Sequence, residues 1–179
     1  MNKLLITIVI ALAVLGGGFA VFSNSNKPGS PADTPIDNTS NFEKAPDFSL
    51  EDYNGNTVSL SDFEGRPLVI NSWAFWCPFC KEELDDFAKI QKEVGDKVDI
   101  IAINRAESLK VAKDFTDEIG VTDDLIFLLD PNDSFYKSIG GFSMPETIFV
   151  DKNGNILEHK RGPMDVEGIR EKVEKLLEF

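Results

Sequence analysis

The feature that most constrains the fold is a pair of cysteines placed where one kind of sequence pattern gives way to another. Cys77 and Cys80 are the only cysteines among the 179 residues. Residues 67–73, before them, are mostly apolar and partly β-branched, which predicts a buried strand. After them, apolar residues recur every three or four positions as far as Val94, which predicts a helix with one buried face. The cysteines therefore lie at the start of a helix that follows a strand.

This position gives the two sulfur atoms different roles. Cys77 lies at the helix N-terminus, where unpaired N–H groups and the positive end of the helix dipole favour a thiolate. Thiols in such positions have pKa values of about 3.5–7.5. Cys80 comes round to the same side of the helix and can close a disulfide with Cys77. We therefore expect Cys77 to be an exposed attacking sulfur and Cys80 the sulfur that resolves the mixed disulfide. A purely structural disulfide is the alternative, although so short a loop constrains little of the unfolded chain.

Composition excludes several classes of function. The chain carries 18 basic and 31 acidic residues, a net charge of −13, so it offers no surface that would neutralise nucleic acid phosphates. With two cysteines and one histidine, one molecule cannot form a four-ligand zinc site of Cys and His. We expect no cofactor and no metal other than the redox-active Cys77–Cys80 pair itself.

The N-terminal part of the chain predicts attachment to a membrane. Residues 4–22 form an uncharged, mostly apolar run that as a helix would span about 28 Å, close to the roughly 30 Å hydrocarbon core of a bilayer. We interpret residues 1–22 as an uncleaved anchor, because no good cleavage site follows; a signal peptide, and hence a secreted protein, is the alternative. Lys3 favours an orientation that places the rest of the chain on the extracytoplasmic side. Residues 23–41 are polar and predict a flexible tether.

Residues 42–179 predict one folded domain. Two short alternating segments around Asn54-Gly55-Asn56 predict a hairpin. The remaining pattern predicts a mixed α/β domain with helices on both faces of its sheet. The strands are expected at residues 97–104, 125–129, 147–150 and 155–160, and the helices at 108–119, 133–139 and 166–177.

Two motifs resemble the thioredoxin superfamily. Trp76-Cys77-Pro78-Phe79-Cys80 is similar to its active-site motif, and Met144-Pro145, just before the strand at 147–150, is similar to its cis-proline loop. The N-terminal hairpin and an extra β–α unit before that loop resemble the membrane-anchored branch that contains TlpA, ResA and DsbE proteins. The resemblance covers about residues 42–179. It implies a thioredoxin fold with an N-terminal β-hairpin extension and a β–α insertion before the cis-proline loop.

The resemblance also implies roles for individual residues. Cys77 and Cys80 would carry the exchange reaction, and the substrate would be bound by Trp76, Pro78, Phe79, Met144 and Pro145. Thioredoxin has a buried aspartate six residues before its first cysteine, where this chain has Asn71, which cannot accept a proton. We therefore take Glu146, beside Pro145, as the candidate proton acceptor.

Other side chains near the motif receive structural interpretations. We expect Glu82, Glu83, Asp85 and Asp86 to form mainly the solvated face of the cysteine helix. Alternation along the strand predicts that Trp73 and Phe75 both belong to the core, whereas Trp76 is exposed beside Cys77.

The predicted function is that of an extracytoplasmic thiol–disulfide oxidoreductase. By resemblance it reduces disulfides in partner proteins, apocytochrome c among them, and receives electrons from a thiol–disulfide protein of the membrane. Three alternatives remain open: a disulfide oxidant, a peroxiredoxin-type peroxidase and a non-catalytic tethered binding module. The peroxidase is disfavoured because its motif has Thr three residues before the reactive cysteine, where this chain has Ala74.

Overall fold

Strand β3 (Leu68–Trp73) is the centre of the fold, because all six of its residues are buried. This computed structural model describes residues 42–179; the predicted anchor (1–22) and tether (23–41) lie outside the described residues. None of the described helices combines the length and the hydropathy needed to cross a membrane.

Within residues 42–179 the sheet has seven strands in the order β2-β1-β5-β4-β3-β6-β7. Strands β3, β4 and β5 are mutually parallel, whereas β6 runs antiparallel to β3 and β7 antiparallel to β6. The N-terminal hairpin β1–β2 joins the sheet through β1, which pairs antiparallel with β5. The other strands are β1 (Ser49–Asp52), β2 (Thr57–Ser59), β4 (Asp99–Arg105), β5 (Ile126–Asp130), β6 (Glu146–Val150) and β7 (Ile156–Arg161).

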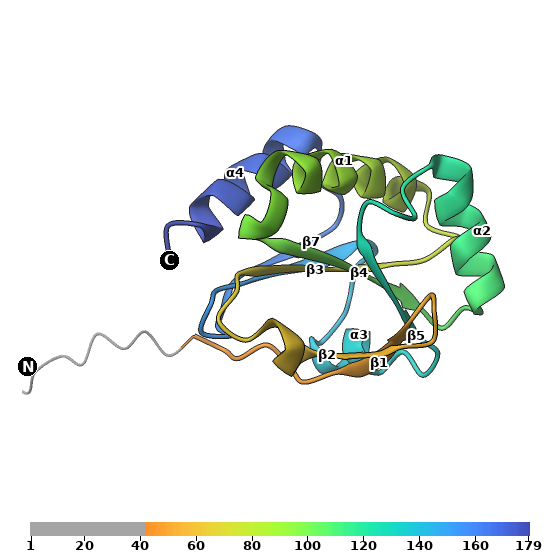
Figure 1. The fold of residues 1–179 in the computed structure, drawn as a ribbon, viewed down its shortest axis with the longest axis horizontal. Helices are drawn as coiled ribbons and strands as arrows, with labels where there is room; N and C mark the ends of the chain where they lie inside the picture. The colour runs from red at the N-terminus through yellow and green to blue at the C-terminus, as the bar shows by residue number, and fades with distance from the viewer. Residues whose placement is uncertain (1–41) are drawn as a thin grey trace, which may run out of the picture. The chain divides into compact units, whose positions relative to one another are not determined.

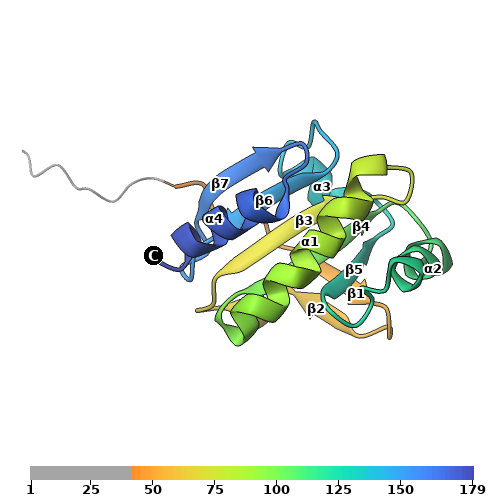
Figure 2. The same ribbon diagram turned by 90° about the horizontal axis from the view of Figure 1, so that it is seen from above.

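In the described part of the chain, four α-helices cover the two faces of this sheet (Figure 1). They are α1 (Pro78–Val94), α2 (Leu109–Ile119), α3 (Ser134–Ser138) and α4 (Val166–Leu176). Helices α1 and α4 lie side by side over one face (Figure 2), and α2 packs on the same face through a cluster that contains Trp73, Phe115 and Phe127. Helix α3 packs on the other face with Ile70, Ile103 and Ile148. The predicted thioredoxin fold is confirmed, with the hairpin β1–β2 at one edge of the sheet and β5–α3 as a β–α unit before the loop at Met144-Pro145.

Strand alternation decides which side chains reach which helix. On β3, Val69, Asn71 and Trp73 point to the face that α1, α2 and α4 cover, whereas Leu68 and Ile70 point to the face that α3 covers. The carboxyl ends of the parallel strands β3, β4 and β5 lie at one edge of the sheet, and the antiparallel β6 begins at that same edge. In open α/β sheets ligands bind outside the carboxyl ends of the strands, and the two cysteines lie at this edge.

Candidate active site

The two cysteines form a disulfide at the start of α1. Cys77 is the N-cap residue and Pro78 occupies the first turn, where the missing N–H of proline costs nothing. The Cα atoms of Cys77 and Cys80 are 5.4 Å apart. The N–H of Cys80 donates a hydrogen bond to Sγ of Cys77 at 3.2 Å. In the reduced state this donor and the helix dipole stabilise negative charge on Cys77, so the predicted division of roles between the sulfur atoms has a structural basis.

The expected exposure of Cys77 is wrong for the disulfide form. Cys77 is 2% exposed and Cys80 is fully buried. Three aromatic residues close to the cysteines in the sequence are exposed instead: Phe75, Trp76 and Phe79 show 55%, 61% and 56% of their surface to solvent.

The expected burial of Phe75 is also wrong. Strand β3 ends at Trp73, so the alternation that buries Trp73 does not continue to Phe75. The Phe75 ring instead contacts Phe115 of α2 edge to face, with centroids 5.7 Å apart. Trp73 is fully buried and stacks on the same Phe115 at 5.5 Å. Trp76 is exposed as expected.

The loop before β6 lies beside the disulfide. The Met144–Pro145 peptide bond is cis, and Met144 packs against the cluster that contains both cysteines. The neighbouring backbone is occupied: Ser143 C=O accepts from the Tyr136 hydroxyl at 2.7 Å, and Pro145 C=O accepts from Gly162 N–H at 3.0 Å. Within residues 42–179, the N–H and C=O of Met144 have no hydrogen-bond partner. They are free to pair with an extended segment of another chain.

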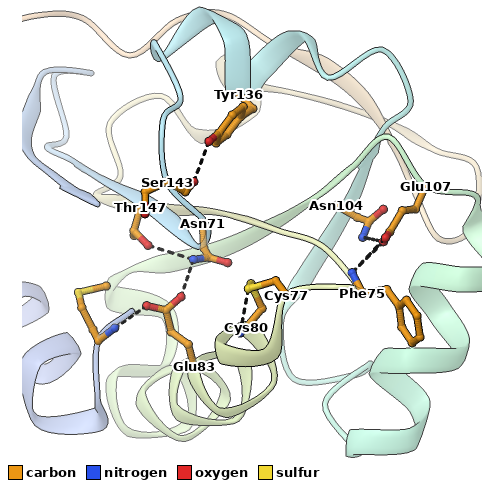
Figure 3. Close-up of a disulfide and its surroundings, with 11 residues drawn as sticks. Asn71, Phe75, Cys77, Cys80, Glu83, Asn104, Glu107, Tyr136, Ser143 and Thr147 are labelled. Carbon is orange, nitrogen blue, oxygen red and sulfur yellow. Dashed lines mark hydrogen bonds between the residues drawn. A yellow bond between two sulfur atoms is a disulfide. The ribbon is translucent and has the colours of Figure 1, made fainter. Parts of the chain in front are cut away.

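Sequence reasoning missed a buried carboxyl group behind the disulfide. Glu83, three residues after Cys80, is 1% exposed rather than solvated. Its Oε2 accepts from Nδ2 of Asn71 at 2.9 Å (Figure 3). Its Oε1 accepts from the backbone N–H of Met164 at 2.9 Å. The same Asn71 amide donates to Thr147 Oγ1 at 3.0 Å. The asparagine that replaces the thioredoxin aspartate therefore holds a carboxyl group supplied by α1.

The environment of Glu83 sets its charge near neutral pH. Burial raises its pKa from 4.5 to about 7, because an ionised carboxyl group loses hydration there. The hydrogen bonds from Met164 and Asn71 and the charge of Lys160 oppose this increase only in part. A carboxyl group with such a pKa takes up and releases a proton at physiological pH. The sequence does contain a signal for it, since Glu83 lies three residues after Cys80 and four before Phe87, on the buried face of the helix.

Glu146 is fully buried but lies in a different environment from Glu83. It shares a face of β6 with Ile148 and Val150, which pack on the side of α3. One carboxylate oxygen accepts from the N–H groups of Phe142 and Ser143, at 2.8 and 2.9 Å.

The other carboxylate oxygen of Glu146 faces two basic side chains of β7. It lies 2.7 Å from Nε2 of His159 and 3.0 Å from Nε of Arg161. One oxygen of Glu146 therefore binds the backbone of the loop before β6 and the other contacts β7. Its predicted role as proton acceptor stays a prediction.

The site contains no evident metal centre. Among the described residues, no three His, Cys, Asp or Glu side chains are arranged to hold a metal ion. The expected absence of a metal or cofactor stays a prediction.

Comparisons with known proteins agree with this geometry. The Redoxin family model matches residues 41–177. The chain belongs to the Redoxin family. It is 30% identical to the thiol:disulfide interchange protein DsbE of Vibrio cholerae, over 99% of this chain and 96% of that protein. It is 26% identical to the thiol-disulfide oxidoreductase ResA of Bacillus thuringiensis, over 98% and 97% of the two chains. The exposed lipoprotein thioredoxin Etrx1 of Streptococcus pneumoniae superposes with a TM-score of 0.66 at 28% identity, over 73% of this chain and 100% of that one.

The predicted enzyme class follows from the site and the family together. A cysteine pair at a helix N-terminus, beside a loop with free backbone groups, has the parts that thiol–disulfide exchange requires. The chain is a thiol–disulfide oxidoreductase of the thioredoxin-like group that includes ResA and DsbE.

Proposed function

We propose that this enzyme is a membrane-anchored, extracytoplasmic reductant of disulfides in partner proteins. Apocytochrome c is the proposed substrate, and a thiol–disulfide protein of the membrane is the proposed electron donor. The observation that carries the proposal is the Cys77–Cys80 pair with Glu83 buried behind it, three residues after Cys80 on the same helix.

The reaction begins from the reduced pair. The Cys77 thiolate attacks one sulfur atom of the substrate disulfide, a mixed disulfide forms, and the second substrate sulfur leaves as a thiolate that takes a proton from water. Cys80 then loses its proton to Glu83 and attacks Sγ of Cys77, which releases the first substrate sulfur as a thiolate. Two electrons pass from the cysteine pair to the substrate, and the pair ends as a disulfide. Two thiols of the membrane donor reduce it again.

Charge at the site supports the reducing direction. When Glu83 is ionised, its negative charge opposes the formation of a thiolate close to it. Less stable thiolates favour the disulfide form of the pair, and a pair that favours its disulfide form is a reductant. The segment between α1 and the cis-proline loop also supports this direction, because it is a β–α–β–α unit rather than the helical insertion expected of a DsbA-type oxidant.

The location and the substrate rest on different observations. The uncharged run at residues 4–22 and the polar residues 23–41 support an anchored, extracytoplasmic domain. The resemblance to the TlpA/ResA/DsbE branch supports apocytochrome c. The exposed aromatic side chains of Phe75, Trp76 and Phe79, close to Cys77 in the sequence, support a substrate disulfide in an unfolded segment, since the apolar side chains of such a segment can lie against them.

The reduction potential tests the direction of the reaction. We expect equilibration with glutathione to give a value near or below that of thioredoxin, about −270 mV. A value near −120 mV, typical of strong oxidants, would contradict the proposal.

Covalent trapping tests the substrate and the location. In Cys80→Ala the mixed disulfide on Cys77 cannot be resolved, so the full-length variant should accumulate disulfide-linked partners in the membrane fraction. Cys77→Ala is the matched control and should trap nothing. Recovery of the wild-type chain and its partners only in the cytosol would refute the proposed location, and absence of apocytochrome c from the trapped proteins would refute that substrate.

A further inference from the structure

The backbone just before the cysteines is held by an acidic side chain from another part of the chain. Glu107 follows the end of β4, and its carboxylate accepts from the backbone N–H of Phe75 through both oxygens, at 3.1 and 3.0 Å (Figure 3). It also accepts from Nδ2 of Asn104 at 2.7 Å. Phe75 lies two residues before Cys77, and in the described part of the chain Glu107 is the only partner of its N–H group.

The turn that carries Glu107 is itself fixed at both ends. Asn104 is fully buried, and Ala106 has a φ of +53°, a left-handed conformation that is uncommon for a residue other than glycine. The Ala106 N–H bonds Asp130 C=O at 2.9 Å, and Ser108 caps α2 by accepting from Val111 N–H. Strained backbone of this kind persists only where the surroundings hold it, and it is often found at functional sites.

Residues 74–76 need such a hold because little else fixes them. They connect the buried Trp73 to the N-cap residue Cys77; Ala74 is fully buried, but Phe75 and Trp76 are more than half exposed. Besides the burial of Ala74 and the bond to Glu107, the segment is restrained by the Phe75 ring on Phe115 and by the bond from Cys77 N–H to Ala74 C=O at 3.1 Å.

We propose that Glu107 is a positioning residue for the exchange reaction. By binding the Phe75 N–H it fixes residues 74–76, and with them the direction in which Cys77 and the exposed Trp76 meet a partner disulfide. This role rests on the proposed function, but the hold on Phe75 can be measured without any substrate. Glu107 touches neither sulfur atom and takes no proton in the reaction.

Three variants of the whole protein test the proposal. Glu107→Ala removes the acceptor, Glu107→Asp keeps the charge but shortens the side chain, and Glu107→Gln keeps an acceptor oxygen. We expect hydrogen exchange of the Phe75 amide to quicken roughly ten- to hundredfold in the Ala and Asp variants, as for loss of a charge-assisted hydrogen bond. We expect kcat/KM for reduction of a disulfide-bonded peptide to fall by a similar factor, as misplacement of a reacting group by about an ångström does.

The Gln variant and a surface control separate positioning from a general loss of structure. Glu107→Gln should recover most of the rate and of the Phe75 protection, whereas Asp114→Ala, on the exposed side of α2, should match the wild type in both. Wild-type values in Glu107→Asp for both Phe75 exchange and kcat/KM would overturn the proposal, even if Glu107→Ala failed to fold. If the wild type itself reduced no peptide disulfide, the proposed function would fail, while Phe75 exchange would still report on Glu107.

Discussion

Replacing Glu83 by glutamine should make the protein more stable at alkaline pH and change how its stability depends on pH. A carboxyl group whose pKa rises from 4.5 to about 7 on folding costs about 3 kcal/mol when it is ionised in the folded protein. The folded state binds this proton more tightly than the unfolded state does. The stability that the protonated Glu83 contributes is therefore fully present below about pH 4.5 and is lost as the pH rises through about 7.

Glutamine removes this charge but changes the hydrogen bonding. Its oxygen can accept from Met164 N–H, and its NH2 group can donate to Oδ1 of Asn71, which has no partner among the described residues. One rearranged hydrogen bond costs about 1 kcal/mol. We therefore expect the unfolding free energy of Glu83→Gln to exceed that of the wild type by about 2 kcal/mol at pH 8 and to fall below it by about 1 kcal/mol near pH 4.

Urea denaturation of the oxidised proteins between pH 4 and pH 8, followed by circular dichroism, measures this difference. Glu82→Gln is the matched control, because Glu82 is exposed on the same helix and should show no such pH dependence. If the curves of Glu83→Gln and the wild type remained parallel from pH 4 to pH 8, Glu83 would not be the buried titrating group, and its role as proton acceptor for Cys80 would fail with it.

Two further substitutions address the loop before β6. Glu146→Gln keeps an acceptor for the N–H groups of Phe142 and Ser143 but loses the charge that faces His159 and Arg161. Because these two basic side chains are partly exposed, we expect the free energy of unfolding, measured by denaturation, to fall by only about 1–2 kcal/mol. An unchanged pH–rate profile would remove Glu146 from proton transfer. Gly141→Ala places a Cβ 2.4 Å from the Tyr136 ring, so we expect the free energy of unfolding, measured by denaturation, to fall by about 1–3 kcal/mol. We also expect peptide disulfides to bind more weakly, which a higher KM would show. Wild-type stability in Gly141→Ala would show that Tyr136 does not need its present position.

Local sequence patterns predicted most of the fold. The strand before the cysteines, the helix after them and the hairpin around Gly55 depend on periodicity and turn chemistry, which act between residues close in the chain. The observed elements β3, α1, β1 and β2 match these predictions. The place of the cysteine pair was predictable for the same reason, because a helix N-terminus and a three-residue spacing are local features. The separate roles of the two sulfur atoms stay a prediction.

The surroundings of the cysteines were not predictable in the same way. A carboxyl residue on an amphipathic helix is normally exposed, and Glu83 is buried only because Asn71 of β3 and the backbone of Met164, far apart in the chain, provide its hydrogen bonds. Phe75 is exposed because β3 ends two residues earlier.

The sequence alone thus determined that a thioredoxin-like domain carries two cysteines at a helix start, since helix geometry brings residues three apart to one side. Tertiary structure decided which carboxyl group accompanies them and how far they are from solvent. The physical reason is that the free energy of a charge depends on all the groups that surround it, and for Glu83 those groups come from β3 and from the segment between β7 and α4.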